Sequence, residues 1–252
     1  MTLLEIEGVG RRFATGTEAL RDASLKIAAG DFVALLGPSG CGKSTLLRLI
    51  AGLDAPDSGA LRWGDGAGMA AGEIGFVFQD ATLLPWATAA ENVWLPLRLR
   101  GVSREAAHDA VWAALGRVGL AGFEGARPRE LSGGMRMRVS IARALVGRPR
   151  LLLMDEPFAA LDEFTRHGLQ DDMLALWRDV GCTVVFVTHS IYEASFLARR
   201  IVVMTPRPGR IAAEISSALA PEAATRFSPG YAALVGEVTG VLRQAMAVGQ
   251  GA

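Results

Sequence analysis

The stretch "FVALLGPSGCGKST", Phe32 to Thr45, decides the fold. Its first five residues form a continuous apolar run, which indicates a strand covered on both faces, as in the parallel sheet of an α/β protein. "GPSGCGKST", Gly37 to Thr45, then matches the phosphate-loop pattern G-x-x-x-x-G-K-[ST], and the helical stretch "LLRLIAGL" follows it. Strand, glycine-rich loop and helix in this order predict an α/β nucleotide-binding domain.

The loop supplies the chemistry that phosphate groups need. Its backbone N–H groups can turn inward around phosphate oxygens, and the N-terminus of the following helix adds positive charge. Lys43 is expected to reach the β and γ phosphates, Ser44 to ligate Mg²⁺ and Thr45 to add a phosphate contact. The expected nucleotide-binding residues are Gly37, Pro38, Ser39, Gly40, Cys41, Gly42, Lys43, Ser44 and Thr45. The alternative is an ordinary glycine-rich turn before a helix.

The composition narrows the class of protein. The chain has 252 residues, half of them apolar, and a formal net charge of zero, so no global field draws it to nucleic acid or anionic lipid. Cys41 and Cys182 match no metal spacing and indicate a reducing compartment. The N-terminus does not resemble a signal peptide, and no apolar run approaches the roughly 20 residues of a membrane span. We expect a cytosolic protein that contacts a membrane only through a partner.

The rest of the chain predicts a mixed sheet with helices. Three more continuous apolar runs, 151–154, 183–187 and 201–204, indicate buried strands, and helical patterns lie between them. The opening stretches "LLEIEGV", "ASLKIAAG" and "LRWG" alternate and are bounded by turn residues, as in an antiparallel layer. The expected fold class is α/β, with a mixed sheet flanked by helices and an antiparallel β layer.

The middle of the chain predicts an inserted helical subdomain. Its helical patterns break at Gly101, Gly119 and Pro128, and no strand-like run lies among them. A short strand "IAAEI" and a helix from about Pro229 follow the turn "TPRPGR". We expect a single domain over 1–252, with a core of about 1–88 and 147–214, a helical subdomain of about 89–146 and a C-terminal helical tail of about 215–252.

Polar side chains follow several of the predicted strands. "LLLMDEP" ends in Asp155 and Glu156, and ligands of open α/β sheets bind at the carboxyl ends of strands. Asp155 suits Mg²⁺ held through water, and Glu156 suits polarisation of an attacking water; the alternative is the N-cap of the next helix. Gln79 and His189 also end strands, where they suit the orientation of water or contact with a γ-phosphate. The alternative for each is a structural role.

"LSGGMRMR", Leu131 to Arg138, looks like a second phosphate-binding helix start. The phosphate loop, Gln79, "LSGGM", "LLLMDEP", "AALD" (159–162) and His189 occur in this order, and together they resemble the ATPase subunits of ATP-binding cassette (ABC) transporters. The resemblance extends from the first strand to at least the "TPRPGR" turn. It implies the ABC ATPase fold, ATP as the nucleotide that is hydrolysed, and Mg²⁺ as cofactor.

The resemblance implies roles for individual residues. Phe13 would stack on adenine, Glu156 would be the catalytic carboxylate, Gln79 would lie near Mg²⁺ and the lytic water, and His189 would contact the γ-phosphate. Asp162 matches the D-loop aspartate, which faces another subunit. The alternatives are a core position for Phe13 and the N-cap of the following helix for Asp162. The expected metal ligands are Ser44, Gln79 and Asp155.

The resemblance also gives the second glycine-rich loop a use. In ABC ATPases two subunits pack head to tail, and each signature loop covers the γ-phosphate on the other subunit's phosphate loop. Ser132 and the N–H groups of Gly133 and Gly134 are suitable donors at the start of a helix. A second copy of the chain, or a close relative, is therefore an expected partner in an ATP-dependent dimer.

Three residues depart from the family pattern. Met137 stands where Gln is frequent, Ala159 where Ser often begins the D-loop, and Ser190 where Asp is common. None of the three changes removes a group that touches phosphate, metal or water, so turnover is still expected.

Two further segments narrow the resemblance to importers. "LLPW" (83–86) and "MTPRPGRI" (204–211) resemble the corresponding segments of importers of the nitrate, sulfonate and taurine type. This implies a transmembrane permease, contacted at Trp86, a periplasmic solute-binding protein as an indirect partner, and a peripheral position on the cytoplasmic face of the inner membrane. The apolar residues of 83–86 either pack inside the helical subdomain or stay exposed for a partner.

Two other functions fit parts of the pattern. One is a soluble ABC-type ATPase acting on nucleic acid or ribosomes, since Arg127–Arg150 holds seven Arg against one Glu. These arginines fall on several faces without interleaved aromatic residues, so we expect no nucleic-acid partner. The other is a regulatory module without turnover, and the pair Asp155 and Glu156 argues against it.

Overall fold

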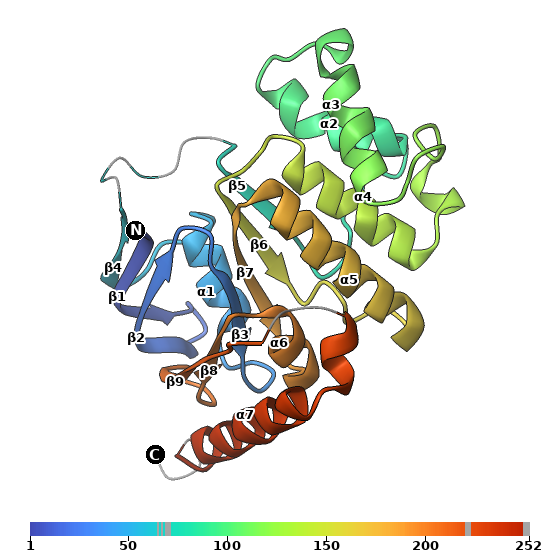
Figure 1. Ribbon diagram of the computed structural model, residues 1–252. Coiled ribbons are helices and arrows are strands. Elements are labelled where there is room, and N and C mark those ends of the chain that lie inside the picture. The colour runs from blue at the N-terminus through green and yellow to red at the C-terminus, as the bar shows by residue number, and fades with distance from the viewer. Residues whose placement is uncertain (65, 67, 69–71, 220–222, 249–252) are drawn as a thin grey trace. The chain divides into compact units, whose positions relative to one another are not determined.

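The computed structural model describes residues 1–64, 66, 68, 72–219 and 223–248 (Figure 1). The chain divides into two compact units, Met1–Met69 with Thr183–Ala252, and Ala70–Cys182. We call the first the phosphate-loop unit and the second the helical unit.

An antiparallel sheet opens the phosphate-loop unit. β1 (Thr2–Arg12) pairs with both β2 (Glu18–Ala28) and β4 (Ser58–Trp63), which gives the strand order β2-β1-β4. On β2, Leu25 and Ile27 are buried while Lys26 between them is exposed. This alternation is the pattern of a half-buried strand, and it is why the sequence predicts an antiparallel layer here.

The other strands of this unit form a mixed arrangement. β3 (Phe32–Leu36) pairs in parallel with β7 (Thr183–Thr188) and with β8 (Arg200–Met204), and β9 (Ile211–Ser216) pairs antiparallel with β8. Every residue of β3 and β7 is buried. Continuous apolar runs are stable in such strands because both of their faces are covered.

Helices cover the strands of the phosphate-loop unit. α1 (Lys43–Ile50) packs against β2 and β7, and α6 (Ile191–Leu197) packs against β3 and β7. After the short 3-10 helix η2 (Ala223–Phe227), α7 (Pro229–Val248) lies along α6, β8 and β9 (Figure 1). The Tyr231 hydroxyl of α7 donates to the carbonyl of Tyr192 in α6 at 3.0 Å, which ties the two helices together.

The helical unit combines two parallel strands with a group of helices (Figure 1). Its elements are β5 (Ile74–Val77), α2 (Ala89–Leu99), α3 (Arg104–Arg117), η1 (Pro128–Glu130), α4 (Gly133–Leu145), β6 (Leu151–Asp155) and α5 (Glu163–Val180). α4 contacts α2, α3, α5 and β5, so its side chains form much of the core of this unit. The side chains of Thr88, Ser103, Ser132 and Asp162 each cap a helix by accepting a hydrogen bond from a backbone N–H three residues further on.

The fold class predicted from the sequence is confirmed: a mixed sheet with helices and an antiparallel layer are both present. The boundaries predicted for the core, for the helical subdomain at about 89–146 and for the tail at about 215–252 stay predictions. Residues 65, 67, 69–71, 220–222 and 249–252, which fall in the predicted core and tail, lie outside the described residues. Among the described residues, every helix is too short or too polar to cross a lipid bilayer.

Candidate functional site

The phosphate loop connects the end of β3 to the start of α1. Lys43 is 4% exposed, and its ammonium donates to the carbonyls of Gly37 at 2.8 Å and Pro38 at 2.9 Å. The Cys41 thiol lies 3.8 Å from the same nitrogen. The lysine is therefore folded back over the loop, with its charge among acceptor atoms of the loop. Of the loop residues, Gly37, Cys41 and Lys43 are buried, Pro38, Gly42 and Thr45 are half-buried, and Ser39, Gly40 and Ser44 are exposed.

Gly42, the N-cap of α1, shows why the loop needs glycine. Its φ is +102°, which L side chains rarely adopt, and a Cβ placed there would lie 2.6 Å from the carbonyl oxygen of Ala19. Both the backbone conformation and the close approach of β2 therefore exclude a side chain. The glycine spacing of the motif reflects these local constraints.

His189 lies at the same sheet edge as the phosphate loop. Leu36 of β3 pairs with Thr188 of β7 in parallel register, so Gly37 and His189 follow paired residues. The turn at His189 is fixed by its neighbours: the Thr188 hydroxyl donates to the buried carboxylate of Glu193, and the Ser190 N–H donates to the Thr188 hydroxyl oxygen at 3.0 Å. The backbone at His189 is thus fixed at the end of β7, and its side chain is exposed.

Ser190 has a local role that explains one departure from the family pattern. Its hydroxyl oxygen accepts from the N–H of Glu193 at 3.3 Å and caps α6. Serine and aspartate are both good N-cap residues, so the serine retains the structural contact.

Gln79, Asp155 and Glu156 come together at one edge of the helical unit. Val77 of β5 pairs with Met154 of β6 in parallel register, so both strands deliver polar side chains to the same edge. The Gln79 amide nitrogen lies 3.5 Å from Oε2 of Glu156, and it is placed to donate to it. Glu156 has φ +46°, a conformation that is uncommon for non-glycine residues and that often marks functional sites.

Ser132, Gly133 and Gly134 form the N-terminus of α4. The Ser132 hydroxyl oxygen accepts from the N–H of Met135 at 3.2 Å, which leaves the hydroxyl proton available to a ligand. Ser132 and Gly133 are exposed. Gly134 is buried, and a Cβ there would lie 2.6 Å from Cγ2 of Thr165 on α5. Gly134 is therefore needed for packing as well as for any contact with phosphate.

Met137 is buried, which accounts for its place in the motif. Its side chain is 4% exposed and lies on the face of α4 that also buries Ile141. The apolar residue therefore contributes to the core of the helical unit. Ala159, by contrast, is exposed, and nothing in the structure explains why it replaces the more usual serine.

Asp162 and Phe13 each make a contact with a nearby residue of the chain. Asp162 caps α5 by accepting from the N–H of Thr165 at 3.0 Å, and this backbone hydrogen bond lowers the pKa of its carboxyl. The N-cap alternative is therefore observed, and the D-loop role stays a prediction. Phe13 is 38% exposed, just after β1, and the Arg11 guanidinium carbon lies 5.7 Å from the ring centroid.

The loop after Gln79 exposes its aromatic residue to solvent. Trp86 is 71% exposed, whereas Leu83 and Leu84 are half-buried. The sequence left two placements open for this segment, packing inside the helical subdomain or exposure for a partner. Trp86 is exposed and therefore available to a partner.

Two polar side chains that the sequence motifs do not single out hold this loop. Asn92 of α2 is fully buried and makes hydrogen bonds to Leu84 and Thr88. Arg143 of α4 donates to the carbonyl of Thr82 at 2.9 Å. Both residues lie in the apolar pattern of a predicted helix, and a polar residue in such a pattern is the signal that could have found them.

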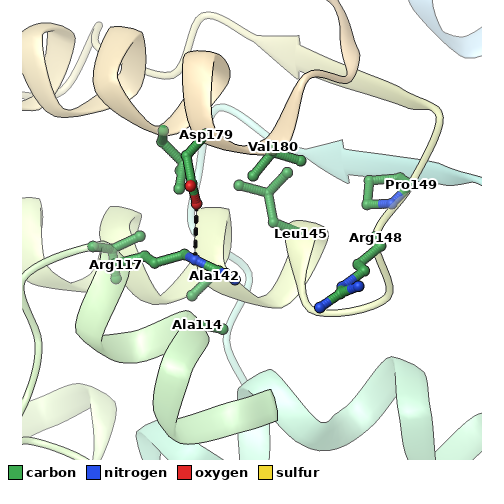
Figure 2. A pocket seen from close by; sticks show the side chains of 10 residues that line it. Ala114, Arg117, Ala142, Leu145, Arg148, Pro149, Asp179 and Val180 are labelled. Carbon is green, nitrogen blue, oxygen red and sulfur yellow. Dashed lines mark ion pairs between the residues drawn. The ribbon is translucent and has the colours of Figure 1, made fainter.

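A cavity of about 290 Å³ lies elsewhere in the helical unit, where the C-terminal ends of α3, α4 and α5 meet (Figure 2). Arg117 of α3 and Asp179 of α5 form an ion pair with 3.0 Å between Nε and Oδ2, and Leu145 contributes to the apolar wall. The described residues that line it include none of the predicted site residues. Arg117 is the last residue of α3, where a cation is favourable, and its ion pair with Asp179 links α3 to α5.

Comparisons with known proteins agree with this chemistry. Residues 20–159 match the family model described as "ABC transporter". The chain is 47% identical over 216 residues to the taurine import ATP-binding protein TauB of Yersinia pestis, covering 85% of this chain and 84% of the relative. It is 43% identical over 222 residues to the nitrate import ATP-binding protein NrtD of Synechocystis, covering 84% and 82%.

Solved structures show the same likeness. One is an ATP-binding cassette in a dimeric, post-hydrolysis state bound to ADP and Pi; it has a TM-score of 0.74 and 34% identity and covers 85% of this chain and 98% of that one. Another is cbiO1 from Clostridium perfringens, part of the transporter complex cbiONQ, with a TM-score of 0.77, 27% identity and coverage of 85% and 88%.

Proposed function

The chain belongs to the ABC transporter family, and we propose that it is the ATP-hydrolysing subunit that energises an importer of taurine, nitrate, a sulfonate or a related small solute. The observation that carries this proposal is the position of the phosphate loop and of polar side chains at strand ends. Gly37 and His189 follow paired strands of one unit, and Gln79 and Glu156 follow paired strands of the other.

ATP hydrolysis needs a positioned water and stabilised phosphate charge more than it needs covalent chemistry. The phosphate loop and Lys43 supply positive charge and N–H donors for the β and γ phosphates. Glu156 would accept the proton of the attacking water, and the Gln79 amide would orient both that water and the carboxylate. His189 would donate to the γ-phosphate from the edge where β7 ends.

The oxygen donors of the predicted metal ligands fit Mg²⁺. Mg²⁺ is bound in NTPase sites by one or two protein oxygens together with phosphate oxygens and waters. The Ser44 hydroxyl, the Gln79 carbonyl and the Asp155 carboxylate are donors of that kind, and the described residues form no cluster of three His, Cys, Asp or Glu that would hold a metal by themselves. When bound, the ion would neutralise charge on the phosphates. The chain itself would supply these oxygen ligands to the ion.

A second copy would complete the site through Ser132, Gly133 and Gly134. They form a helix N-terminus at which Ser132 and Gly133 are exposed and the Ser132 hydroxyl proton is available, which suits an anionic γ-phosphate. The likeness to a cassette solved as a dimer supports this assembly. Closure on two ATP molecules and reopening after hydrolysis would then drive the transporter.

The permease would dock on the helical unit. Trp86 is exposed on a loop that Asn92 holds in place. A groove of about 310 Å³ in the same unit is lined by Phe76, Phe78, Leu95 and Leu99, among other residues, and Leu99 is 79% exposed. These apolar surfaces suit an amphipathic helix on the cytoplasmic side of a permease. The protein would accordingly lie on the cytoplasmic face of the inner membrane, with the solute-binding protein on the other side.

The test is co-purification with the permease and ATPase assays of the assembled transporter. Taurine, an alkanesulfonate and nitrate, each presented with the binding protein, are compared as stimulants. We expect one of them to stimulate hydrolysis, and we expect Trp86→Glu to abolish both stimulation and permease capture. Trp112→Glu, on α3 at 38% exposure, is the matched control. Retained capture and stimulation in Trp86→Glu would refute docking at this loop.

A further inference from the structure

Arg143 is a charged, half-buried residue of the helical unit. It lies on α4, the helix whose N-terminus carries Ser132, and its guanidinium donates to the carbonyls of Ala81 at 3.0 Å and Thr82 at 2.9 Å. The same group reaches the Thr82 hydroxyl oxygen at 3.1 Å and the Ser140 hydroxyl oxygen at 3.4 Å. The planar guanidinium of Arg143 therefore bridges two successive residues of the loop that follows Gln79.

The charge of Arg143 is satisfied without a carboxylate. None of the ion pairs among the described residues includes it, and burial lowers the pKa of its guanidinium. Even the partial burial of a charge is unfavourable unless the charge is well hydrogen-bonded, so an apolar residue would serve packing alone better. The planar guanidinium of arginine can donate to two neighbouring carbonyls at once. The ammonium of lysine lacks this geometry.

The segment held by Arg143 is itself strained. Thr82 has φ +44°, which is an outlier for a β-branched residue. Such a conformation persists only where surrounding contacts enforce it. Four residues further on lies the exposed Trp86, and Asn92 fixes the intervening Leu84 by hydrogen bonds to its N–H and carbonyl. The loop from 81 to 86 is thus held by a half-buried polar side chain from α4 and a fully buried one from α2.

We propose that Arg143 is a positioning residue that makes the loop 81–86 and the signature helix α4 move as one body. A permease that displaces Trp86 would then displace Ser132 at the other end of α4 as well. The distance between residues 132 and 143 along the helix is about 16 Å. This rests on the proposed docking of a permease at Trp86.

The experiment uses the transporter complex with Arg143→Met, which keeps the length of the side chain and removes its donors. Permease capture, ATPase activity of the subunit alone, and kcat and KM for ATP of the stimulated complex are measured. We expect stimulated kcat to fall roughly tenfold, a usual size for coupling between two sites, while KM and unstimulated activity change by less than about twofold. Capture of the permease is expected to persist.

Arg138→Met is the matched control on the same helix. Arg138 also donates to a backbone carbonyl, that of Val118 at 2.8 Å, and pairs with Asp172, but its hydrogen bonds do not involve 79–86. It is expected to lower the melting temperature and to keep stimulation. Arg143→Lys keeps the positive charge and removes the planar guanidinium, and it is expected to give partial stimulation. It also provides a folded variant if Arg143→Met does not fold.

Stimulation at the wild-type level in Arg143→Met or in Arg143→Lys would overturn the proposal. Equal losses in the Arg138 and Arg143 variants would also overturn it, because they would indicate a general effect on folding. Loss of permease capture in Arg143→Met would make this residue part of the docking surface instead. Failure of the wild-type protein to capture the permease would contradict the proposed function first, so the two failures are distinguishable.

Discussion

Lys43 is one of only two lysines in the chain, and the two have opposite environments. Lys43 is buried and donates to two carbonyls of the phosphate loop, whereas Lys26 lies on the exposed side of β2 and pairs with Glu5. Since a surface ion pair contributes little to stability, the second lysine offers a comparison in which charge is removed without touching the site.

Lys43→Ala is expected to weaken ATP binding by about ten- to a hundredfold, because it removes charge-assisted hydrogen bonds to phosphate. The measurement is titration with a fluorescent ATP analogue. Lys26→Ala is the control and should bind ATP with unchanged affinity. Equal affinities for the two variants would contradict the assignment of Lys43 to the phosphates.

Glu156→Gln tests the assigned general base. We expect kcat for ATP hydrolysis to fall by about 10²- to 10⁴-fold, the usual contribution of such a group, while ATP binding persists. Glu163→Gln, on the exposed first turn of α5, is the control and should hydrolyse ATP normally. Hydrolysis in Glu156→Gln within about twofold of the wild-type rate would exclude Glu156 as the base.

Cys182 provides a test that depends on pH. Burial raises the pKa of its thiol to about 11, above the ordinary value of 9.0. The folded state therefore holds this proton more tightly than the unfolded state does. Its contribution to stability is complete below pH 9 and is lost as the pH rises from 9 toward 11.

We expect that iodoacetamide does not label Cys182 in the folded protein at pH 8 and labels it after unfolding in urea. Mass spectrometry of peptides would identify the labelled residue. Cys182→Ser should remove that part of the decline in unfolding free energy between pH 9 and 11 that comes from this thiol. Rapid labelling of the native protein would show that the thiol is accessible and ionised.

At the scale of elements, neighbouring residues of α2 make two different kinds of contact. Thr88 and Glu91 form a capping box at its start, which satisfies backbone N–H groups of the first turn. Asn92, one residue later, uses its amide to fix the loop that precedes the helix. The first contact stabilises the helix itself, and the second determines where Trp86 lies.

Asn92→Ala is expected to lower the unfolding free energy by about 2 to 4 kcal/mol, since it removes four hydrogen bonds and leaves the Leu84 N–H without its partner. Thr88→Ala, which removes only the cap of the same helix, should cost about 1 kcal/mol. Urea denaturation measures both. If Asn92→Ala costs no more than Thr88→Ala, the loop is not held by the asparagine.

At the scale of the whole molecule, the proposed dimer depends on α4 presenting Ser132 to a second copy. Ser103 is a close structural counterpart, because it caps α3 by accepting from Ala106 N–H at 3.2 Å, as Ser132 caps α4 at 3.2 Å. Loss of either cap should have a similar effect on stability. An effect on assembly should be confined to Ser132.

Ser132→Arg is expected to abolish the ATP-dependent dimer in the Glu156→Gln background and to abolish hydrolysis in the transporter. Ser103→Arg should do neither. Size-exclusion chromatography with light scattering, with and without ATP, gives the oligomeric state. A dimer that forms with ATP in the Ser132→Arg protein would show that the signature loop does not cover the nucleotide of the other copy.

Much of this protein follows from local patterns. The phosphate loop, the strands with continuous apolar runs and the N-cap alternative for Asp162 all came from neighbouring residues, because backbone geometry and burial repeat with the period of each element. The family resemblance added roles for Gln79, Glu156 and His189 that spacing could not supply.

The tertiary structure alone decided which distant residues meet. Arg143 holds Thr82 across 61 positions of sequence, Gln79 faces Glu156 across 77, and Met137 is buried on the core side of α4. No local period encodes such pairs, because they depend on how helices and strands pack after they form. Motif residues could therefore be read from the sequence, whereas the side chains that hold them in place were found only in the folded chain.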